Sequence, residues 1–354
     1  MTPQELDREV SRAIDARLNA LAEAITARQY ELHPELAERY GAAGRAKCLQ
    51  DAGFHLSYLA ESISASQPSL FADYIAWAKV MLEGRGIAAS DLGRNLEIMS
   101  DALRQTLPKE MAEVASEYVE SGLMQLPQLP SDLPTCIGVN NPLAQLAKQY
   151  LNALLRGERH VASKLILDAV EGGASVKDIY LNVFERCQHE IGRLWQMNLL
   201  SVAQEHYCTA ATQLIMSQLY PHILDKDKNG RTLVATCVAG DLHEIGVRMV
   251  SDFFEMEGWD TFYLGANAPT TCVLETLAER DVDVLAVSAT MTPHVSAVAG
   301  LITAVRSSRV GQGIKIMVGG YPFNIAPDLW QSVGADAGAR DARESVMVAN
   351  QLAA

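Results

Sequence analysis

Residues 233–246 read LVATCVAGDLHEIG, and this stretch decides the fold of the C-terminal part of the chain. Residues 233–238 form an apolar run of strand length that is rich in β-branched side chains, and Gly240 interrupts it. From Glu244 onward the apolar residues recur with helical periodicity. The stretch therefore predicts a strand that passes through a short loop into a helix, and the loop has the spacing D-x-H-x-x-G.

The same alternation continues toward the C-terminus. Three more apolar runs follow at 261–264, 282–287 and 314–318, and helical stretches lie between or after them at 244–257, 270–280, 293–309 and 323–333. Strands that alternate with helices predict a parallel sheet covered on both faces. Ligands of such sheets bind at the carboxyl ends of the strands, so the loops there are the candidate site. No G-x-G-x-x-G sequence follows the first strand, which argues against a dinucleotide site.

The loop after the first strand has the residues of a metal-ligand pair. The imidazole of His243 can ligate a metal through one nitrogen, while Asp241 accepts the N–H of the other nitrogen and fixes the tautomer. Gly246 has no Cβ, so a bulky group can approach the start of the helix closely. Taken alone, the pair also fits a loop histidine beside a capping aspartate. Small or hydroxyl residues follow the other three strands: Leu264 and Gly265, Ser288 and Thr290, and Gly319 and Gly320.

Composition restricts the class of protein. The 354 residues are 49% hydrophobic and 20% charged, which is ordinary for a soluble, multi-domain chain. The formal net charge of −14 argues against nucleic-acid binding, which depends on clustered Lys and Arg. Six cysteines without a C-x-x-C pair argue against a zinc ribbon or a disulfide framework. With no apolar run of membrane-spanning length and no signal peptide, we expect a cytoplasmic protein without membrane attachment.

The chain divides by sequence pattern into four segments. Residues 1–125 show helical periodicity throughout and predict an all-α domain. Residues 126–142 hold four prolines and predict a linker. Residues 143–226 predict a four-helix bundle, and residues 227–354 form the α/β domain described above. The predicted fold class is therefore multi-domain, with an all-α N-terminal domain, a four-helix bundle and a flavodoxin-like (Rossmann-type) parallel sheet.

Residues 231–354 resemble the B12-binding domain of methionine synthases, mutases and corrinoid proteins, whose signature is D-x-H-x-x-G with S-x-T and G-G. The resemblance implies that His243 is the lower axial ligand of the cobalt of cobalamin and that Asp241 is its hydrogen-bond partner. It also implies that residues at the other strand ends line the channel for the nucleotide tail. The cofactor-binding residues expected in this domain are Asp241, Leu242, His243, Ile245, Gly246, Leu264, Gly265, Ser288, Thr290, Gly319 and Gly320.

The bundle at 143–226 resembles the helical cap over the upper face of cobalamin. Trp195, Glu205 and His206 have the spacing W-x9-E-H, which is similar to that of light-sensing B12 domains. The resemblance implies that the tryptophan packs on a 5′-deoxyadenosyl group and that the glutamate hydrogen-bonds it, which favours adenosylcobalamin. A core tryptophan beside a solvated Glu-His pair is the alternative. Gln196 stands where related carotenoid-gene repressors have a histidine that ligates cobalt after photolysis, so this upper ligand is not expected here.

The N-terminal helices carry His55, Tyr58, Tyr74 and Trp77, which are candidates for a pocket that holds a planar tetrapyrrole. A helical sensor or dimerisation domain with buried aromatic residues is the alternative. The order of domains resembles that of photocobilins, in which a globin-like domain binds a bilin such as biliverdin beside an adenosylcobalamin photoreceptor. Haem instead of a bilin, and a thioether to Cys48 instead of non-covalent binding, both stay open at this point.

These resemblances predict a B12-dependent photoreceptor in which light cleaves the Co–C bond of adenosylcobalamin and the domains rearrange, with a bilin tuning the response. Output would pass through self-association in a homo-oligomer or through a downstream protein partner, so a regulator is expected more than an enzyme. Two alternatives remain. One is a corrinoid protein that carries a methyl group for a methyltransferase, and the other is a cobalamin-binding regulator without photochemistry.

Overall fold

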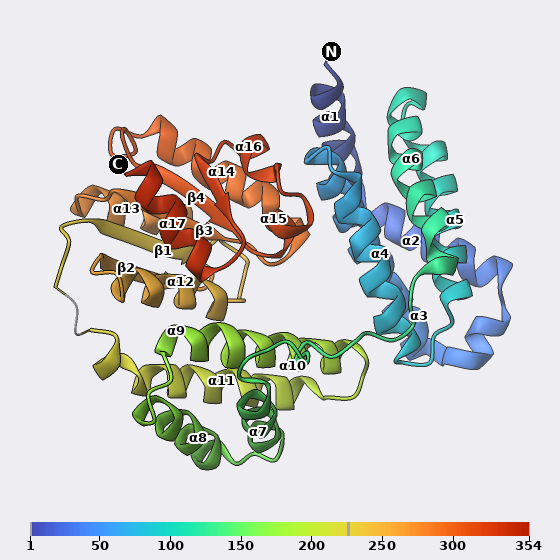
Figure 1. Ribbon diagram of the computed structural model, residues 1–354. Coiled ribbons are helices and arrows are strands. Elements are labelled where there is room, and N and C mark those ends of the chain that lie inside the picture. Colours follow the sequence, from blue (N-terminus) through green and yellow to red (C-terminus); the bar gives the residue numbers. More distant parts are fainter. Residues whose placement is uncertain (1, 225–226, 354) are drawn as a thin grey trace. The chain divides into compact units, whose positions relative to one another are not determined.

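The computed structural model describes residues 2–224 and 227–353, which divide into two compact units (Figure 1). The first unit holds the N-terminal helices up to Ser131 together with Thr290–Ala299 and Tyr321–Val333. The second unit holds Asp132–Ala289, Gly300–Gly320 and the chain from Gly334 onward. The bundle and the sheet, which the sequence analysis treats as separate domains, thus lie in one compact unit.

Over the described residues before Leu126, the first unit contains six α-helices, in agreement with the all-α domain that the periodicity predicts. They are α1 (Pro3–Asp15), α2 (Leu18–Leu32), α3 (Glu35–Ser64), α4 (Pro68–Glu83), α5 (Ala89–Thr106) and α6 (Lys109–Gln125), followed by the short 3-10 helix η1 (Leu126–Gln128). A capping box formed by Thr2 and Glu5 begins α1. Gly41, at φ +62°, kinks α3, a conformation that is costly for other residues.

The second unit begins with the bundle. Its elements are α7 (Ala144–Leu155), α8 (Arg159–Glu171), α9 (Val176–Ile179), the π-helical turn η2 (Tyr180–Phe184), α10 (Glu185–Gln196), α11 (Val202–Gln218) and the 3-10 turn η3 (Tyr220–His222). Because α9, η2 and α10 follow one another without a break, the bundle has four helical segments over the described residues, as predicted. Ser201 and Gln204 form the capping box that begins α11.

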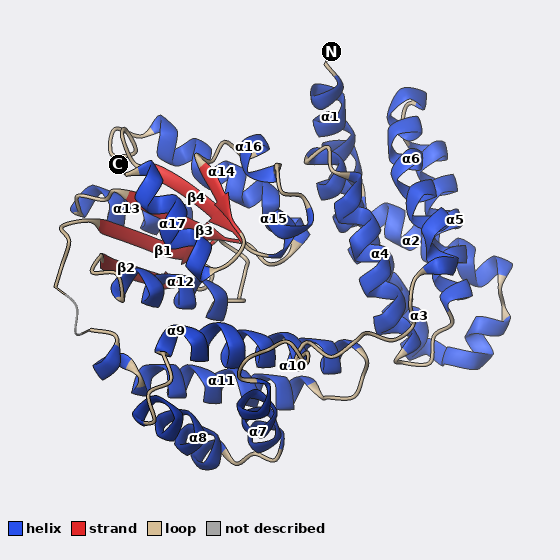
Figure 2. Ribbon diagram, in the orientation of Figure 1, coloured by secondary structure: helices blue, strands red, loops and turns tan. Residues whose placement is uncertain are grey.

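Within the described residues, the sheet has five parallel strands in the order β2-β1-β3-β4-β5 (Figure 2). They are β1 (Thr232–Cys237), β2 (Asp260–Gly265), β3 (Val284–Ser288), β4 (Lys315–Gly319) and β5 (Ala337–Ala339). This flavodoxin-like order confirms the predicted fold class. The sequence analysis missed β5, because its residues Ala-Gly-Ala carry no apolar or β-branched signal.

Helices cover both faces of the sheet. The helices that follow β1 in the chain are α12 (Ile245–Glu255), α13 (Thr270–Glu279), the 3-10 turn η4 (Thr292–His294), α14 (Val295–Ser307), α15 (Tyr321–Ile325), α16 (Leu329–Ser332) and α17 (Ala342–Leu352). Helices α12 and α17 pack side by side on one face. The right-handed crossovers expected between parallel strands put α13 and α14 on the other face. The single helix predicted for 323–333 is wrong: Pro327 interrupts it, and two short helices form instead.

A common hydrophobic core joins the bundle to the sheet. Large side chains from the bundle, such as Tyr150, Tyr180 and Phe184, belong to the same buried cluster as Phe253 and Trp259 from the α/β region. All five are almost fully buried. Burial of this much apolar surface explains why the bundle and the sheet form one unit.

Candidate functional site

The strand order places the switch point between β1 and β3. The chain leaves β1 for β2 on one side and later returns to β3 on the other, so the loops after β1 and β3 diverge at the carboxyl edge. At this edge Cys237 pairs with Ser288, and Ser288 pairs with Gly319. The structure thus brings Ser288 and Gly319 next to the strand that leads into the His243 loop.

Asp241 and His243 form a tightly held pair in that loop. Asp241 is fully buried, and its Oδ1 lies 2.8 Å from Nδ1 of His243 and accepts a hydrogen bond from the His243 backbone N–H at 3.0 Å. The His243 side chain is 56% exposed. Because Nδ1 is engaged by the carboxylate, Nε2 is the nitrogen that remains for a metal.

Carboxylates from both the α/β region and the bundle affect the pKa of His243. The hydrogen bond to Asp241 raises the pKa of His243, burial opposes that rise, and the charges of Asp241 and of Glu205 on α11 add to it. Glu205 lies on α11, so the bundle adds a second negative charge to the surroundings of the imidazole. The site therefore has one carboxylate hydrogen-bonded to the ring and a second, on the bundle, whose charge also acts on it.

Asn267 braces the loop, and the sequence analysis missed it. Its Oδ1 accepts a hydrogen bond from the Gly240 backbone N–H at 2.7 Å, and its own N–H donates to the Asp241 carbonyl oxygen at 2.9 Å. Asn267 has φ +53° and Gly240 has φ +91°, both in the left-handed region. Asn is one of the non-glycine residues that best tolerate this region. Its position directly after Gly265-Ala266, at the end of a predicted strand, was the sequence feature that could have indicated its role.

Replacement of Asn267 by Ala is expected to lower the free energy of unfolding by about 1–3 kcal/mol. The variant loses the bond to the Gly240 N–H and places a less tolerant residue at positive φ. Urea unfolding followed by circular dichroism measures the change. Asn267→Asp is the matched control, because it keeps an acceptor oxygen and tolerates the left-handed region; equal losses in both variants would contradict the bracing role.

The other predicted positions differ in what surrounds them. Leu242 is 72% exposed, and a Cβ added at Gly246 would meet no atom within 4 Å, so both face open space. A Cβ at Gly265 would lie 3.3 Å from Glu244 Oε2, and one at Gly320 would lie 2.0 Å from the Ala289 carbonyl oxygen. Gly320 is therefore required by packing inside the protein.

The remaining predicted residues of the α/β region are partly buried, closely packed or outside the second unit. Ile245 and Leu264 are half-buried, the first in the opening turn of α12 and the second near the end of β2. A Cβ at Gly319 would lie 2.9 Å from the Ala339 carbonyl oxygen. Thr290 begins the segment Thr290–Ala299, which belongs to the first unit.

The predicted residues of the bundle lie on two successive helices. Trp195 packs against the common core near the end of α10, and Glu205 lies in the first turn of α11. The Glu205 carboxylate is 2.6 Å from Nδ1 of the exposed His206 and accepts a hydrogen bond from the Thr209 hydroxyl at 3.0 Å. Gln196 is buried. Glu205 is thus held in place by its own helix.

The comparisons with known proteins bear on this region. Residues 231–349 match the B12 binding domain, and residues 146–220 match a second family model described as a B12 binding domain. Monomethylamine corrinoid protein 1 of Methanosarcina mazei is 30% identical over 213 residues, which cover 58% of this chain and 96% of that protein. The chain belongs to the B12-binding corrinoid proteins.

Other corrinoid proteins show the same relationship. Dimethylamine corrinoid protein 3 of Methanosarcina acetivorans is 31% identical over 127 residues, covering 36% of this chain and 58% of that protein. The solved structure of the Methanosarcina barkeri monomethylamine corrinoid protein covers 59% of this chain and 99% of its own, with a TM-score of 0.53 and 22% identity. That structure supports the fold. The N-terminal helices lie outside both matched family domains.

A lone imidazole suits the cofactor of this family. Among residues 2–224 and 227–353, no group of three or more His, Cys, Asp or Glu side chains is arranged to hold a bare metal ion. Cobalamin would bring its own macrocycle, so the protein would have to offer the cobalt a single nitrogen, and His243 has one at an exposed position. The residues present therefore fit cobalamin.

The four aromatic candidates of the first unit do come together. His55 Nδ1 lies 2.7 Å from the Tyr74 hydroxyl, the rings of Tyr58 and Tyr74 stack at 3.8 Å between centroids, and Trp77 lies 6.2 Å from Tyr74. They pack against one another within the helical core. Burial raises the pKa of the Cys48 thiol to about 11, so it stays protonated at neutral pH, which disfavours a thioether. A bilin or haem at this cluster stays a prediction.

His55 gives the first unit a pH-dependent stability. Burial lowers its pKa to about 4, below the value of about 6.5 in an unfolded chain. The unfolded state therefore binds the proton first as pH falls, and we expect His55 to reduce the free energy of unfolding by about 2 kcal/mol between pH 8 and pH 5. Urea unfolding at both pH values, with His55→Gln as the comparison, measures this contribution; the same pH dependence in both proteins would contradict it.

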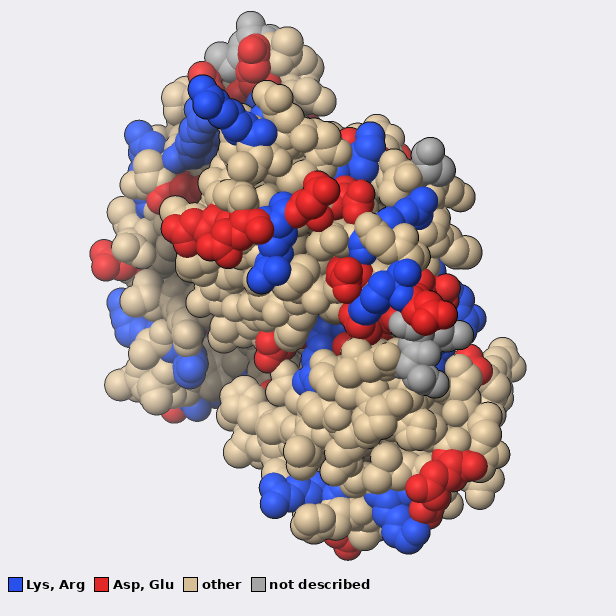
Figure 3. Space-filling model, turned by 90° about the vertical axis from the view of Figure 1, so that its left-hand side faces the viewer, with Lys and Arg blue, Asp and Glu red and all other residues tan. Residues whose placement is uncertain are grey.

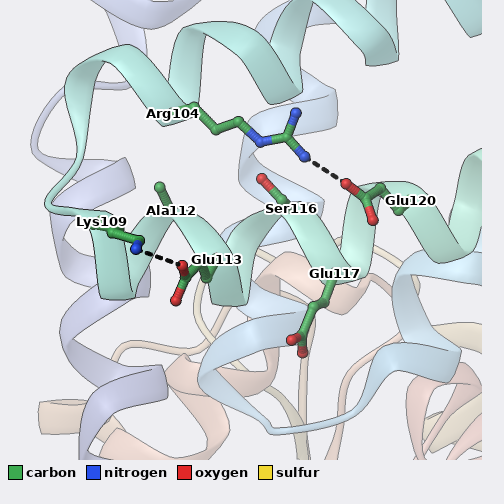
Figure 4. Close-up of a pocket in the computed structure, with 7 residues that line it drawn as sticks. All are labelled: Arg104, Lys109, Ala112, Glu113, Ser116, Glu117 and Glu120. Carbon is green, nitrogen blue, oxygen red and sulfur yellow. Dashed lines mark hydrogen bonds and ion pairs between the residues drawn. The ribbon is translucent and has the colours of Figure 1, made fainter.

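A separate hollow of about 490 Å³ lies on α5 and α6 (Figure 4). Arg104 pairs there with Glu120, and Lys109 lies 3.8 Å from Glu113. These ion pairs are solvent-exposed and account for the charged lining, apart from Glu117. The hollow contains none of the residues that the sequence analysis selected.

Two further findings concern the predictions on membranes and nucleic acids. Over the described residues, no helix combines the length and the apolar content needed to cross a membrane. On the face drawn in Figure 3, Lys and Arg side chains are interspersed with Asp and Glu. The expectation that the protein does not bind nucleic acid stays a prediction, as do homo-oligomer formation and the cytoplasmic location.

Proposed function

We propose that this corrinoid protein holds cobalamin with His243 as the lower cobalt ligand and carries a methyl group for a separate methyltransferase. The observation that carries the proposal is the buried Asp241 that fixes the His243 imidazole at the switch point of the sheet. The expectation of a light sensor is thereby replaced as the leading function, because the relatives named above are amine corrinoid proteins.

Each residue has a role that follows from its surroundings. Asp241 keeps the proton of the imidazole on Nδ1, which leaves the Nε2 lone pair for the metal. The hydrogen bond to Asp241 and the charges of Asp241 and Glu205 raise the pKa of His243, so an Nε2 without a metal would take up a proton more readily than an ordinary imidazole. Leu242 and Gly246 offer an apolar, uncrowded surface to the ring. Cobalamin itself, when bound, supplies a cobalt centre that accepts and gives up a methyl group.

Light sensing with adenosylcobalamin is the second candidate, and one observation favours it. Trp195 lies in the last turn of α10 and Glu205 in the first turn of α11, so both are near the connection between these helices, and the charge of Glu205 acts on His243. A carboxylate in that position suits the ribose hydroxyls of an adenosyl group. For methyl carriage the same residues would only shield the upper face. A bilin in the helical unit belongs to this second candidate.

The choice of upper ligand separates the two functions. Apoprotein is titrated in the dark with methylcobalamin and with adenosylcobalamin, and the affinities of wild type and Glu205→Ala are compared. Methyl carriage predicts that wild type binds methylcobalamin at least as tightly as adenosylcobalamin and that Glu205→Ala changes neither affinity much. A wild-type preference for adenosylcobalamin that Glu205→Ala removes, with light-driven loss of the adenosyl spectrum, would overturn methyl carriage. Added biliverdin tests the bilin prediction in the same cuvette.

A further inference from the structure

The first unit contains two segments that continue strands of the sheet. The chain enters this unit at Thr290, two residues after β3 ends, and again at Tyr321, two residues after β4 ends. We call Thr290–Ala299 the β3 segment, Tyr321–Val333 the β4 segment and α1 to α6 the helical domain. Both segments leave the carboxyl ends of parallel strands, and Thr290 is one of the predicted cofactor-binding residues. The helical domain thus shares a compact unit with chain that bears on the predicted site.

Side chains of α3 and α4 contact both segments. On α3, Glu61 Oε1 accepts a hydrogen bond from the Ser296 hydroxyl of the β3 segment at 2.6 Å. On α4, Asp73 Oδ1 accepts a hydrogen bond from the Tyr321 hydroxyl of the β4 segment at 3.0 Å. These bonds join residues that lie 235 and 248 positions apart in the chain. The helical domain therefore holds each segment through a carboxylate.

The contact of Glu61 lies where α14 begins. Helix α14 begins at Val295, and both the hydroxyl and the backbone N–H of Ser296 donate to the Glu61 carboxylate. The first N–H groups of a helix lack partners within the helix, and a carboxylate there also interacts favourably with the helix dipole. Such a cap usually comes from the residue that precedes the helix. For α14 a carboxylate from another helix, α3, serves this purpose.

Burial of Glu61 depends on the position of this first turn. Glu61 is 9% exposed, although Ser296 is itself exposed. If the first turn of α14 moved away, water would reach the carboxylate. By contrast, Tyr321 is 50% exposed and Asp73 is half-buried, so water can replace their hydrogen bond at small cost. Glu61 is therefore the residue whose surroundings change most when the β3 segment moves.

The ionisation of Glu61 is linked to this movement. Burial raises the pKa of Glu61 to about 7, the hydrogen bonds from Ser296 oppose that rise, and the charge of Asp15 at the end of α1 adds to it. The 3-10 turn η4, which packs on α3, carries the titratable His294. In a solvated Glu61 the pKa returns to about 4.5, so the open state loses the proton first as pH rises. The contact therefore weakens between about pH 4.5 and pH 7.

We propose that Glu61 holds the first turn of α14 on the helical domain and so positions Thr290, while Asp73 holds the β4 segment. The inference goes beyond the proposed function, because it gives a role to helices that lie outside both matched family domains. Glu61 and Asp73 are positioning residues. Ionisation of Glu61 makes the placement of Thr290 dependent on pH near neutrality.

The first test compares two serine substitutions in the first unit. Ser296→Ala removes the hydroxyl that donates to Glu61, whereas Ser57→Ala removes a hydrogen bond to the Gly53 carbonyl oxygen inside α3. Hydrogen exchange of the apoprotein is measured by mass spectrometry at pH 6. We expect Ser296→Ala to speed exchange in residues 291–299 by roughly three- to tenfold, corresponding to one lost hydrogen bond, and Ser57→Ala to leave that segment unchanged. Equal exchange in the two variants would overturn the proposal.

The second test uses pH to separate the charge of Glu61 from its packing. In wild type, after correction for intrinsic exchange rates, we expect residues 291–299 to open roughly ten times more often at pH 8 than at pH 6. Glu61→Gln keeps the size and an acceptor oxygen but cannot ionise, so its opening should be the same at both pH values. His294→Gln is the control and should keep the wild-type dependence. Loss of the dependence in His294→Gln, or its persistence in Glu61→Gln, would overturn the role of Glu61.

The third test concerns the β4 segment. Tyr321→Phe removes the hydroxyl that donates to Asp73, and we expect it to speed exchange in α15 by roughly two- to fivefold. Unchanged exchange there would overturn the role of Asp73. All three tests use the apoprotein, so a failure of wild type to bind cobalamin would refute the proposed function while these measurements still decide the roles of Glu61 and Asp73.

Discussion

His243→Ala is expected to weaken hydroxocobalamin binding by roughly a hundredfold or more and to convert the bound spectrum to that of cobalamin without a nitrogen lower ligand. Loss of an outer-shell partner of a metal ligand already costs about 10- to 100-fold in affinity, so loss of the ligand itself should cost at least as much. Asp241 would then remain buried beside an empty position, since it is fully inaccessible in the structure. Absorbance titration of apoprotein gives both the affinity and the spectrum.

The control for this prediction is His160→Ala. His160 is an exposed residue in the first turn of α8, in the bundle and not in the His243 loop, and its removal should change neither quantity. Added imidazole should restore part of the spectrum of His243→Ala, because the space that the side chain leaves is open to solvent. An unchanged spectrum in His243→Ala would refute the assignment of the lower ligand.

Two glycine substitutions are expected to separate folding from cofactor binding. Gly320→Ala would place a Cβ 2.0 Å from the Ala289 carbonyl oxygen at φ +107°, where backbone must move to relieve the clash. We expect a loss of about 3 kcal/mol or more in the free energy of unfolding. Gly246→Ala meets no atom within 4 Å and lies in the first turn of α12, so its stability should stay within about 1 kcal/mol of wild type.

Gly246→Ala, which is expected to change stability little, should weaken cofactor binding. The Cβ of Gly246→Ala projects into the open space before α12, where the proposed site needs room for the corrin ring. We therefore expect a folded protein that binds hydroxocobalamin at least about tenfold more weakly, a loss of about 1.4 kcal/mol. Thermal unfolding and absorbance titration measure the two properties in parallel. Wild-type affinity in folded Gly246→Ala would show that the ring does not approach this helix.

Sequence pattern was sufficient for most of the regular elements and located the loops at the ends of four strands. Four strands were predicted because each is a run of apolar, β-branched residues, whereas β5 was missed because Ala337–Ala339 has almost no side chain to signal burial. The strand order, which brings Ser288 and Gly319 beside the His243 loop, follows from the connections of an α/β fold.

The hydrogen bonds that support the site could not be predicted from the sequence pattern. Asn267 and Glu244 act through hydrogen bonds to residues that are distant in sequence, and no local spacing marks them. The W-x9-E-H spacing at Trp195 and Glu205 predicts adenosylcobalamin, and this stays a prediction, because the Glu205 carboxylate is held by His206 and Thr209 of its own helix. The aromatic residues near His55 pack together as expected for a pocket and equally as expected for a core.

The most direct test of the account is electron paramagnetic resonance of the protein reconstituted with cobalamin and reduced to the Co(II) state, with ¹⁵N incorporated only into histidine. If the His243 imidazole is the lower ligand, each cobalt line splits into a doublet, because ¹⁵N has nuclear spin one half. In unlabelled protein the same lines are triplets. Triplets in the labelled protein would show that the nitrogen of cobalamin's own base remains on the cobalt, and lines without nitrogen splitting would show that no nitrogen binds; either result would contradict the account.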